Sequence, residues 1–197
     1  LRLVRMAVMG DPRCGRCVIM ICEHSAEGTM GLILNKPSSD VSFHDLAEQL
    51  ELGTPEAAQQ VNFGGPVEMG RGFVLHSSEY VSGRSSHLVL EGLRLSTSLD
   101  VLEDMVTGTG PSAALLMLGY AGWGAGQLEA EILANGWLSG PADAAFVLSG
   151  GGDEMWSAAL KRLGVSPLLP SAPAGRACAF LLPRHLPINP SPGLACC

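Results

Sequence analysis

The sequence predicts a single α+β domain, built around a curved, mixed or antiparallel, barrel-like sheet with helices packed outside it. Short apolar and β-branched segments outnumber the segments with helical periodicity, and the two kinds do not alternate strictly. Strict alternation would indicate a doubly wound sheet. The length of 197 residues suits one domain, and a hydrophobic content of 47% is enough for a sizeable core.

The expected strands are short apolar segments bounded by glycine, proline or polar residues. Two pairs read as hairpins: the segments on either side of residues 25–28, and those on either side of Glu91-Gly92. Another pair surrounds the corner Gly64-Gly65-Pro66. The full set of expected strands is 1–10, 18–24, 30–35, 60–63, 72–76, 87–90, 93–95, 112–120, 136–139 and 144–148.

Four helices are expected from apolar spacing and capping residues. Ser42 opens the first, with Asp45 three residues later as in a capping box. Thr97 or Ser98 opens the second, whose inward face would hold Leu99, Leu102, Met105 and Val106. Residues 127–135 form the third, and Asp153 caps the fourth.

The composition changes near residue 167. Seven of the 13 prolines lie in the last 31 residues, which contain no acidic residue. We therefore expect a domain over residues 1–166 and a proline-rich tail over 167–197, extended and either disordered or laid on the domain.

The charge distribution disfavours direct binding to DNA. All 19 acidic residues but only eight of the 12 basic ones precede residue 155, so this part carries a net charge of −11. An acidic body repels phosphate backbones, and no helix clusters Arg or Lys. No apolar run approaches the roughly 18 residues that span a bilayer, and no signal-like start is present. These features predict a cytoplasmic protein that does not enter the membrane.

The most site-like segment is 119–131, GYAGWGAGQLEAE, which reads as a strand end, a tight glycine loop and a helix start. Glycine lets the backbone approach a ligand closely, and the N–H groups near residues 124–127 could bind an anion or a carbonyl. Trp123 would form one wall. The alternative is close packing of strand on helix, with Tyr120 and Trp123 in the core. The candidate ligand-binding residues here are Tyr120, Trp123, Gly124, Gly126, Gln127 and Glu131.

Helix geometry selects Gln127 with Glu131 as the pair that can share a face, since they stand four apart, whereas Glu129 and Glu131 point in different directions. The alternative is a solvated face. Asn35 and Lys36 precede Pro37 at a strand end, where Asn35 could instead fix a turn. Gly64 and Gly65 form the corner already described. We expect these segments to converge on one ligand site.

Other motifs give weaker indications. The glycine loop lacks the third glycine of a dinucleotide fingerprint, and no phosphate-binding loop or G-x-S-x-G elbow occurs. His24 and His76 end strands and could act as bases or ligands, or simply as polar caps. Cys14 and Cys17 form a C-x-x-C before a strand rather than a helix, which favours reduced, structural cysteines over redox or metal chemistry. We expect neither a metal nor a cofactor.

Four segments in order resemble the bacterial YqgE/AlgH family (UPF0301): GLILNKP at 31–37, NFGGPV at 62–67, GFVLH at 72–76 and the glycine-rich segment 119–131. The resemblance covers about residues 6 to 165 and implies the same α+β architecture. Members of the family are labelled as uncharacterised or, by association with alginate control, as transcriptional regulators. The family supplies no catalytic residues to carry over.

Two functions follow from these features. The first is a cytoplasmic, non-enzymatic ligand-binding or regulatory protein, with an unidentified small ligand or protein partner. The alternative is a small hydrolase or isomerase in which His24 or His76 works with Glu131. A histidine within hydrogen-bond reach of a carboxylate at the glycine loop would favour the second.

Overall fold

The fold is organised around β8 (Ala114–Gly124), an 11-residue strand in the middle of the sheet. The computed structural model describes residues 2–5, 15–81 and 85–165. Along one side β8 pairs antiparallel with β5 (Val67–Ser77). Along the other it pairs first with β4 (Val61–Phe63), in parallel, and then with β3 (Gly28–Ile33), antiparallel. Strands far apart in the chain therefore meet on β8.

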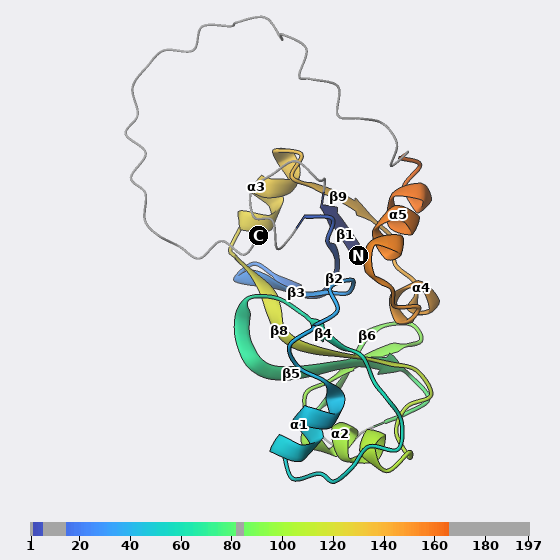
Figure 1. Cartoon of the computed structure of the whole chain (residues 1–197). Coiled ribbons are helices and arrows are strands. Elements are labelled where there is room, and N and C mark those ends of the chain that lie inside the picture. Colours follow the sequence, from blue (N-terminus) through green and yellow to red (C-terminus); the bar gives the residue numbers. More distant parts are fainter. Residues whose placement is uncertain (1, 6–14, 82–84, 166–197) are drawn as a thin grey trace, which may run out of the picture.

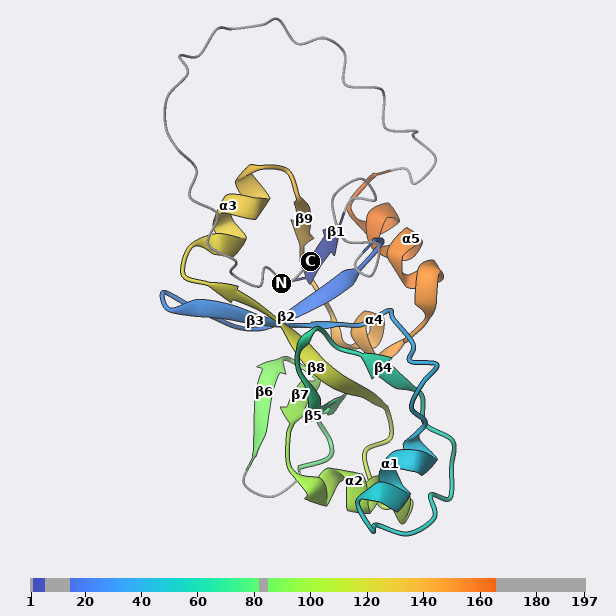
Figure 2. The same cartoon turned by 60° about the vertical axis from the view of Figure 1, so that its left-hand side comes forward.

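The other strands extend the sheet outward from β5 and from β3, in the order β6-β7-β5-β8-β3-β2-β1-β9. They are β1 (Arg2–Arg5), β2 (Val18–Ser25), β6 (Ser86–Leu90), β7 (Leu93–Ser96) and β9 (Trp137–Gly140). The sheet coils into a nearly closed, barrel-like form, as the two views in Figures 1 and 2 show. This confirms the α+β class and the barrel-like sheet expected from the sequence.

Five helices are present in the described part of the chain, and they pack outside the sheet in three places (Figure 1). One pair lies at the end of the molecule near β5, a second pair near β1, and α3 stands by itself beside the end of β8. They are α1 (Phe43–Gln49), α2 (Leu99–Val106), α3 (Gln127–Leu133), α4 (Ala144–Leu148) and α5 (Gly152–Arg162). None of them is long and apolar enough to cross a membrane.

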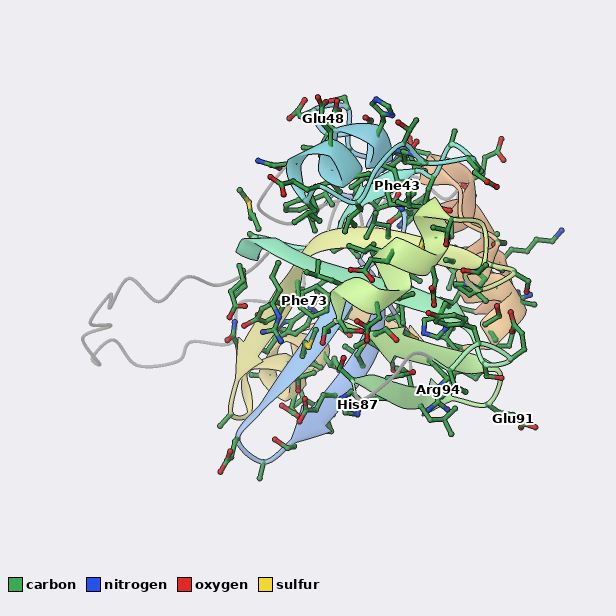
Figure 3. The ribbon with its side chains drawn as sticks, turned by 90° about the horizontal axis from the view of Figure 1, so that it is seen from below. Phe43, Glu48, Phe73, His87, Glu91 and Arg94 are labelled. Atoms are coloured by element: carbon green, nitrogen blue, oxygen red, sulfur yellow. The ribbon has the colours of Figure 1, made fainter. Side chains whose placement is uncertain are left out.

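Each group of helices covers its own hydrophobic cluster. The largest cluster lies around Phe73 and Met117 and is covered by α4 and α5 through residues such as Trp156; we call it the α4–α5 cluster. Beneath α1 and α2 a second cluster is built around Phe43, and α3 covers a third around Trp123. Figure 3 shows Phe43 on the inner side of α1 and Glu48 on its outer side.

Several local predictions are confirmed. The side chain of Ser42 accepts the N–H of Asp45, whose carboxylate accepts the N–H of Ser42, which completes the expected capping box of α1. The strands on either side of Glu91-Gly92 form an antiparallel hairpin, as do β2 and β3. Glu129 and Glu131 point to different partners on α3.

Three local predictions were wrong. Residues 144–148 form α4 rather than a strand, because the Asp143 side chain caps the N–H of Phe146 and starts a helix. Leu99, expected to point inward, is 50% exposed at the start of α2. The last helix begins after Gly151, so Asp153 lies in its first turn instead of capping it.

The tight loop expected after residue 119 was also wrong, since β8 continues to Gly124. Residues 121–124 pair with β3, so the β2–β3 hairpin supplies backbone partners that the local sequence does not show. Of the C-x-x-C pair, Cys17 is buried beside Ile19, whereas Cys14 lies outside the described residues, as does the tail from residue 166 onward.

Candidate functional site

A bulge at Gly119 decides which way the glycine-rich end of β8 faces. Before it, Met117 belongs to the α4–α5 cluster and Leu118 to the α1–α2 cluster; after it, Tyr120 belongs to the α4–α5 cluster and Ala121 to the α3 cluster. Leu118 and Tyr120 would share a face in a regular strand, so the alternation of side chains reverses at Gly119. Gly119 has a φ of +72°, and the β5–β8 register shifts at this point. Gly122, two residues after Tyr120, therefore lies on the same face as Tyr120.

Three of the glycines are required for packing. A Cβ on Gly64 would come within 2.3 Å of the Gly119 carbonyl oxygen, and one on Gly65 within 2.1 Å of the Tyr120 carbonyl carbon. A Cβ on Gly119 would approach the Gly65 oxygen to 2.2 Å. The corner at 64–66 crosses directly over β8, and only glycine permits this approach.

The other glycines of the segment differ among themselves. Gly126 has a φ of +70° and makes the turn into α3. Gly122 and Gly124 lie in the strand without a positive φ, and a Cβ on either would make only ordinary contacts, at 3.4 Å or more. Neither backbone conformation nor packing requires glycine at these two positions.

Gly122 lies at a shallow hollow with a volume of about 390 Å³. The Tyr120 ring and Val67 lie beside it, since a Cβ on Gly122 would be 3.4 Å and 3.7 Å from them. The rest of the lining comes from Trp123 and from the β2–β3 hairpin, including Glu23, Glu27 and Met30. We call this the Gly122 hollow. Both glutamates are exposed, and none of the lining residues is basic.

The predicted pair of Gln127 and Glu131 meets in the structure, with the amide donating to the carboxylate at 3.0 Å. The other Glu131 oxygen accepts hydrogen bonds from the indole N–H groups of Trp123 and Trp137, at 3.1 and 2.8 Å. Both indoles are buried, and Trp123 is also one of the residues that line the hollow. The Gly124 N–H, considered for anion binding, already donates to Gln127 at 3.0 Å.

Asn35 is buried and joins three segments of backbone. Its oxygen accepts the N–H of Val18, and its amide donates to the carbonyls of Arg16 and Gly152, at 2.8, 2.8 and 3.2 Å. Asn35 thus has a structural role through distant segments of the chain, and not through a turn of its own. Lys36 is half-buried, and its carbonyl accepts the N–H of Phe63 at 2.7 Å.

The predicted site residues fall into two groups. Gly64 and Gly65 lie against β8, with the Gly64 N–H donating to the Leu118 carbonyl at 2.8 Å, whereas Asn35 and Lys36 bond residues 16–18, Gly152 and Phe63 instead. Trp123, Gly124, Gly126, Gln127 and Glu131 gather around the start of α3, with Tyr120 between the two groups. Only Tyr120 and Trp123 of the ten contribute atoms to the Gly122 hollow.

Neither histidine meets Glu131. His24 lies between Thr29 and Glu129, with Nδ1 2.7 Å from the hydroxyl and Nε2 3.3 Å from the carboxylate. His76 is fully buried, bonded to the Ser96 hydroxyl at 2.9 Å and to the adjacent carbonyl. Burial lowers the pKa of His76 below its usual value, which favours the neutral ring.

Comparison with known proteins identifies the family. The model of the AlgH-like family, DUF179, matches residues 2–168. A UPF0301 protein of Ruegeria pomeroyi is 51% identical over 178 residues, covering 89% of this chain and 96% of its own. Another, from Bradyrhizobium diazoefficiens, is 44% identical and covers 89% of this chain and 86% of its own. The chain belongs to the AlgH-like family.

Solved structures agree with the AlgH-like architecture. The solution structure of the AlgH protein from Pseudomonas aeruginosa superposes with a TM-score of 0.72 at 44% identity, covering 89% of this chain and 94% of that one. A crystal structure of a protein from Corynebacterium diphtheriae shares the fold, with a TM-score of 0.66 at 24% identity over 85% and 86% of the two chains.

Sequence reasoning missed the hairpin side of the hollow in this AlgH-like chain. Glu23, Glu27 and Met30 reach Gly122 only because β3 pairs with the end of β8. The one available signal was the pair of carboxylates near the expected 25–28 turn, Glu23 before it and Glu27 within it. Across the described residues, no group of three or more His, Cys, Asp or Glu side chains is placed to hold a metal ion.

Proposed function

We propose that this chain is a non-enzymatic ligand-binding protein with a regulatory role, and that its ligand occupies the Gly122 hollow. The supporting observation is Gly122 itself. Gly64, Gly65 and Gly119 are accounted for by close backbone contacts, but Gly122 has room for a side chain and carries none. A side chain at this position would project from the floor of the hollow and reduce its volume.

The charge of the hollow favours a ligand that bears an amine. Glu23 and Glu27 contribute carboxylates to its rim, and Tyr120 and Met30 contribute apolar surface. A cation would gain from both carboxylates and from the aromatic ring, whereas a phosphate or carboxylate would be repelled. This replaces the anion considered from the sequence. An aliphatic polyamine has the required combination of methylenes and ammonium groups.

The test is a thermal-shift and calorimetric titration of the purified chain with spermidine, cadaverine and butylamine, beside inorganic phosphate and citrate. We expect the amines to raise Tm, because a ligand that binds only the native state stabilises it. Gly122→Val should abolish the shift, and the matched variant Gly124→Val, in the same strand outside the hollow, should retain it. Stabilisation by phosphate, or equal loss in both variants, would contradict the proposal.

The regulatory part of the proposal requires a partner other than DNA. The net charge of −11 over residues 1–154 makes direct contact with phosphate backbones unfavourable, so ligand occupancy would be communicated to a protein. We place this activity in the cytoplasm, as the sequence suggests. Retention of the chain on duplex DNA at physiological salt would argue for direct DNA binding instead.

A hydrolase or isomerase is the second candidate, and His24 is the observation in its favour. The chain of Thr29 hydroxyl, His24 ring and Glu129 carboxylate has the order of a nucleophile, a base and an orienting acid. However, His24, Thr29 and Trp123 are paired with one another across β2, β3 and β8, so their side chains point to one face of the sheet. Met30 pairs with Gly122, and these two residues of the hollow belong to the opposite face. Turnover of an ester substrate that is lost in His24→Ala but kept in Gly122→Val would favour the enzyme.

A further inference from the structure

A second concave surface lies between α1, α2 and the middle of the sheet, away from the Gly122 hollow. Leu46 and Leu50 of α1 and Leu99 and Leu102 of α2 form its walls, and its floor is formed by β5 and β8. Its volume is about 180 Å³. A cavity of about 150 Å³ lined by aliphatic side chains is enough to hold benzene. We call this surface the α1–α2 groove.

Two glycines leave the floor of the α1–α2 groove bare. Gly70 and Gly72 lie in β5 on the same face as the buried Val74, and a Cβ on either would meet no atom within 4 Å. Neither has a positive φ, so neither is needed for a turn. In an amphipathic strand these positions would ordinarily hold apolar side chains that fill the space under the helices.

The rim of the groove exposes large apolar side chains. Leu50 and Leu99 keep 39% and 50% of their surface in contact with solvent. Isolated exposed leucines are common, but here they border one apolar cavity. Together they provide a continuous apolar strip with a socket the size of a large aliphatic or aromatic side chain.

The helices that form the groove are acidic throughout. Between Lys36 and Arg71 the sequence has no Lys or Arg, and none again between Arg94 and Lys161. The two helices carry five carboxylates: Asp45, Glu48, Asp100, Glu103 and Asp104. On β5 the nearest cation is Arg71, whose guanidinium lies over the Phe73 ring on the opposite face and bonds Glu68. The apolar walls therefore belong to acidic helices, and the exposed Glu103 stands one helical turn after Leu99 on the same side of α2.

We infer that the α1–α2 groove is the docking site for a basic amphipathic segment of a partner protein, with an apolar side chain in the socket and Lys or Arg along the rim. A helix laid into an apolar groove presents such anchors at positions i, i+3, i+4 and i+7. A second copy of this chain fits poorly, because a twofold contact would bring the same acidic helices against each other. The inference does not depend on the Gly122 hollow or its ligand.

The probe for this site is a fluorescent, amphipathic helical peptide of about 18 residues (five turns), with leucine on one face and lysine on the other. Two control peptides replace either the leucines by alanine or the lysines by glutamate. Fluorescence anisotropy at physiological salt should show binding of the leucine–lysine peptide, with at least about tenfold weaker binding of both controls.

Matched variants locate the contact on the chain. Leu99→Gln and Gly72→Val should each weaken binding by about tenfold or more, and Glu103→Gln by about threefold. The controls Leu133→Gln, on the exposed side of α3, and Glu154→Gln, with the same change of charge elsewhere, should not. All altered positions are exposed or adjoin open space, and unchanged circular dichroism and Tm show that each variant is folded.

Several outcomes would overturn the inference. Equal binding of the lysine–alanine peptide would show non-specific attraction to an acidic protein, and equal binding of the leucine–glutamate peptide would show a groove without charge selection. Loss of binding in Leu133→Gln to the same extent as in Leu99→Gln would place the contact elsewhere. Absence of binding by the leucine–lysine peptide up to millimolar concentration would exclude a partner of this chemistry.

Discussion

Replacing Glu131 by glutamine tests whether this carboxylate is a structural acceptor. Its side chain joins β8, α3 and β9, because it accepts hydrogen bonds from Trp123, Gln127 and Trp137. The two indole rings are 4% exposed and pack edge to face at 5.9 Å. Glu131 thus satisfies two buried N–H donors that have apolar surroundings.

The magnitude follows from the number of donors that lose their acceptor. In Glu131→Gln one amide oxygen remains, so one of the acceptor positions is replaced by an N–H₂ group that faces a donor. A buried donor without its partner costs about 1–3 kcal/mol, and the loss of charge weakens the bonds that remain. We therefore expect the free energy of unfolding to fall by about 2 kcal/mol. In a domain of this size Tm would fall by about 4–8 °C.

The assay is urea denaturation followed by far-ultraviolet circular dichroism, since tryptophan fluorescence would report the substitution itself. Glu129→Gln is the matched control, because Glu129 is two residues away on the exposed face of α3 and contacts only His24 among the partners described here. We expect it to change the free energy of unfolding by less than about 0.5 kcal/mol. If Glu131→Gln lowers the free energy of unfolding no more than Glu129→Gln does, the hydrogen bonds from the two indoles do not stabilise the fold and the reasoning is wrong.

Three further predictions concern the bulge and two titrating groups. Gly119→Ala should lower the free energy of unfolding by about 2–4 kcal/mol, because alanine is strained at a positive φ and its Cβ would contact the Gly65 carbonyl. The control Gly124→Ala should change the free energy of unfolding by less than about 0.5 kcal/mol, and urea denaturation measures both. Hydrogen bonds from two serines lower the pKa of Glu79 from 4.5 to about 2, so its contribution to stability should be complete above pH 4.5 and be lost as the pH falls toward 2. In Glu79→Gln the free energy of unfolding should fall less between pH 4.5 and pH 2 than in the unaltered chain. The same fall in both proteins would refute this role of Glu79. Burial lowers the pKa of His76 below 6.5, so stability should decrease as the pH falls below 6.5, and His76→Gln should flatten the curve there; a curve that steepens would contradict the assignment.

Local patterns were enough to predict the features that depend on neighbours in the chain. The capping box of α1 needs only Ser42 and Asp45, and the contact between Gln127 and Glu131 needs only the pitch of one helix. The hairpin around Glu91-Gly92 follows from two short strands with a turn between them. The order of four family-like segments predicted the AlgH-like architecture that the comparisons confirm.

Local patterns failed where a distant segment decides the outcome. The glycines at 119–126 look alike in the sequence, yet Gly119 is held against Gly65, Gly126 makes a turn, and Gly122 is open to the hollow. Residues 144–148 are apolar enough for either a strand or a helix, and the cap at Asp143 selects the helix.

The sequence by itself determined the class of fold, the family, most of the elements and the acidic character of the chain, because these depend on composition, periodicity and local capping. Tertiary structure alone decided the two concave surfaces. The Gly122 hollow exists because the β2–β3 hairpin pairs with the end of β8, and the α1–α2 groove because Gly70 and Gly72 lie beneath two helices that are about 20 or more residues away along the chain. Contacts between segments so far apart in the chain are set by strand pairing and packing, which no local pattern records.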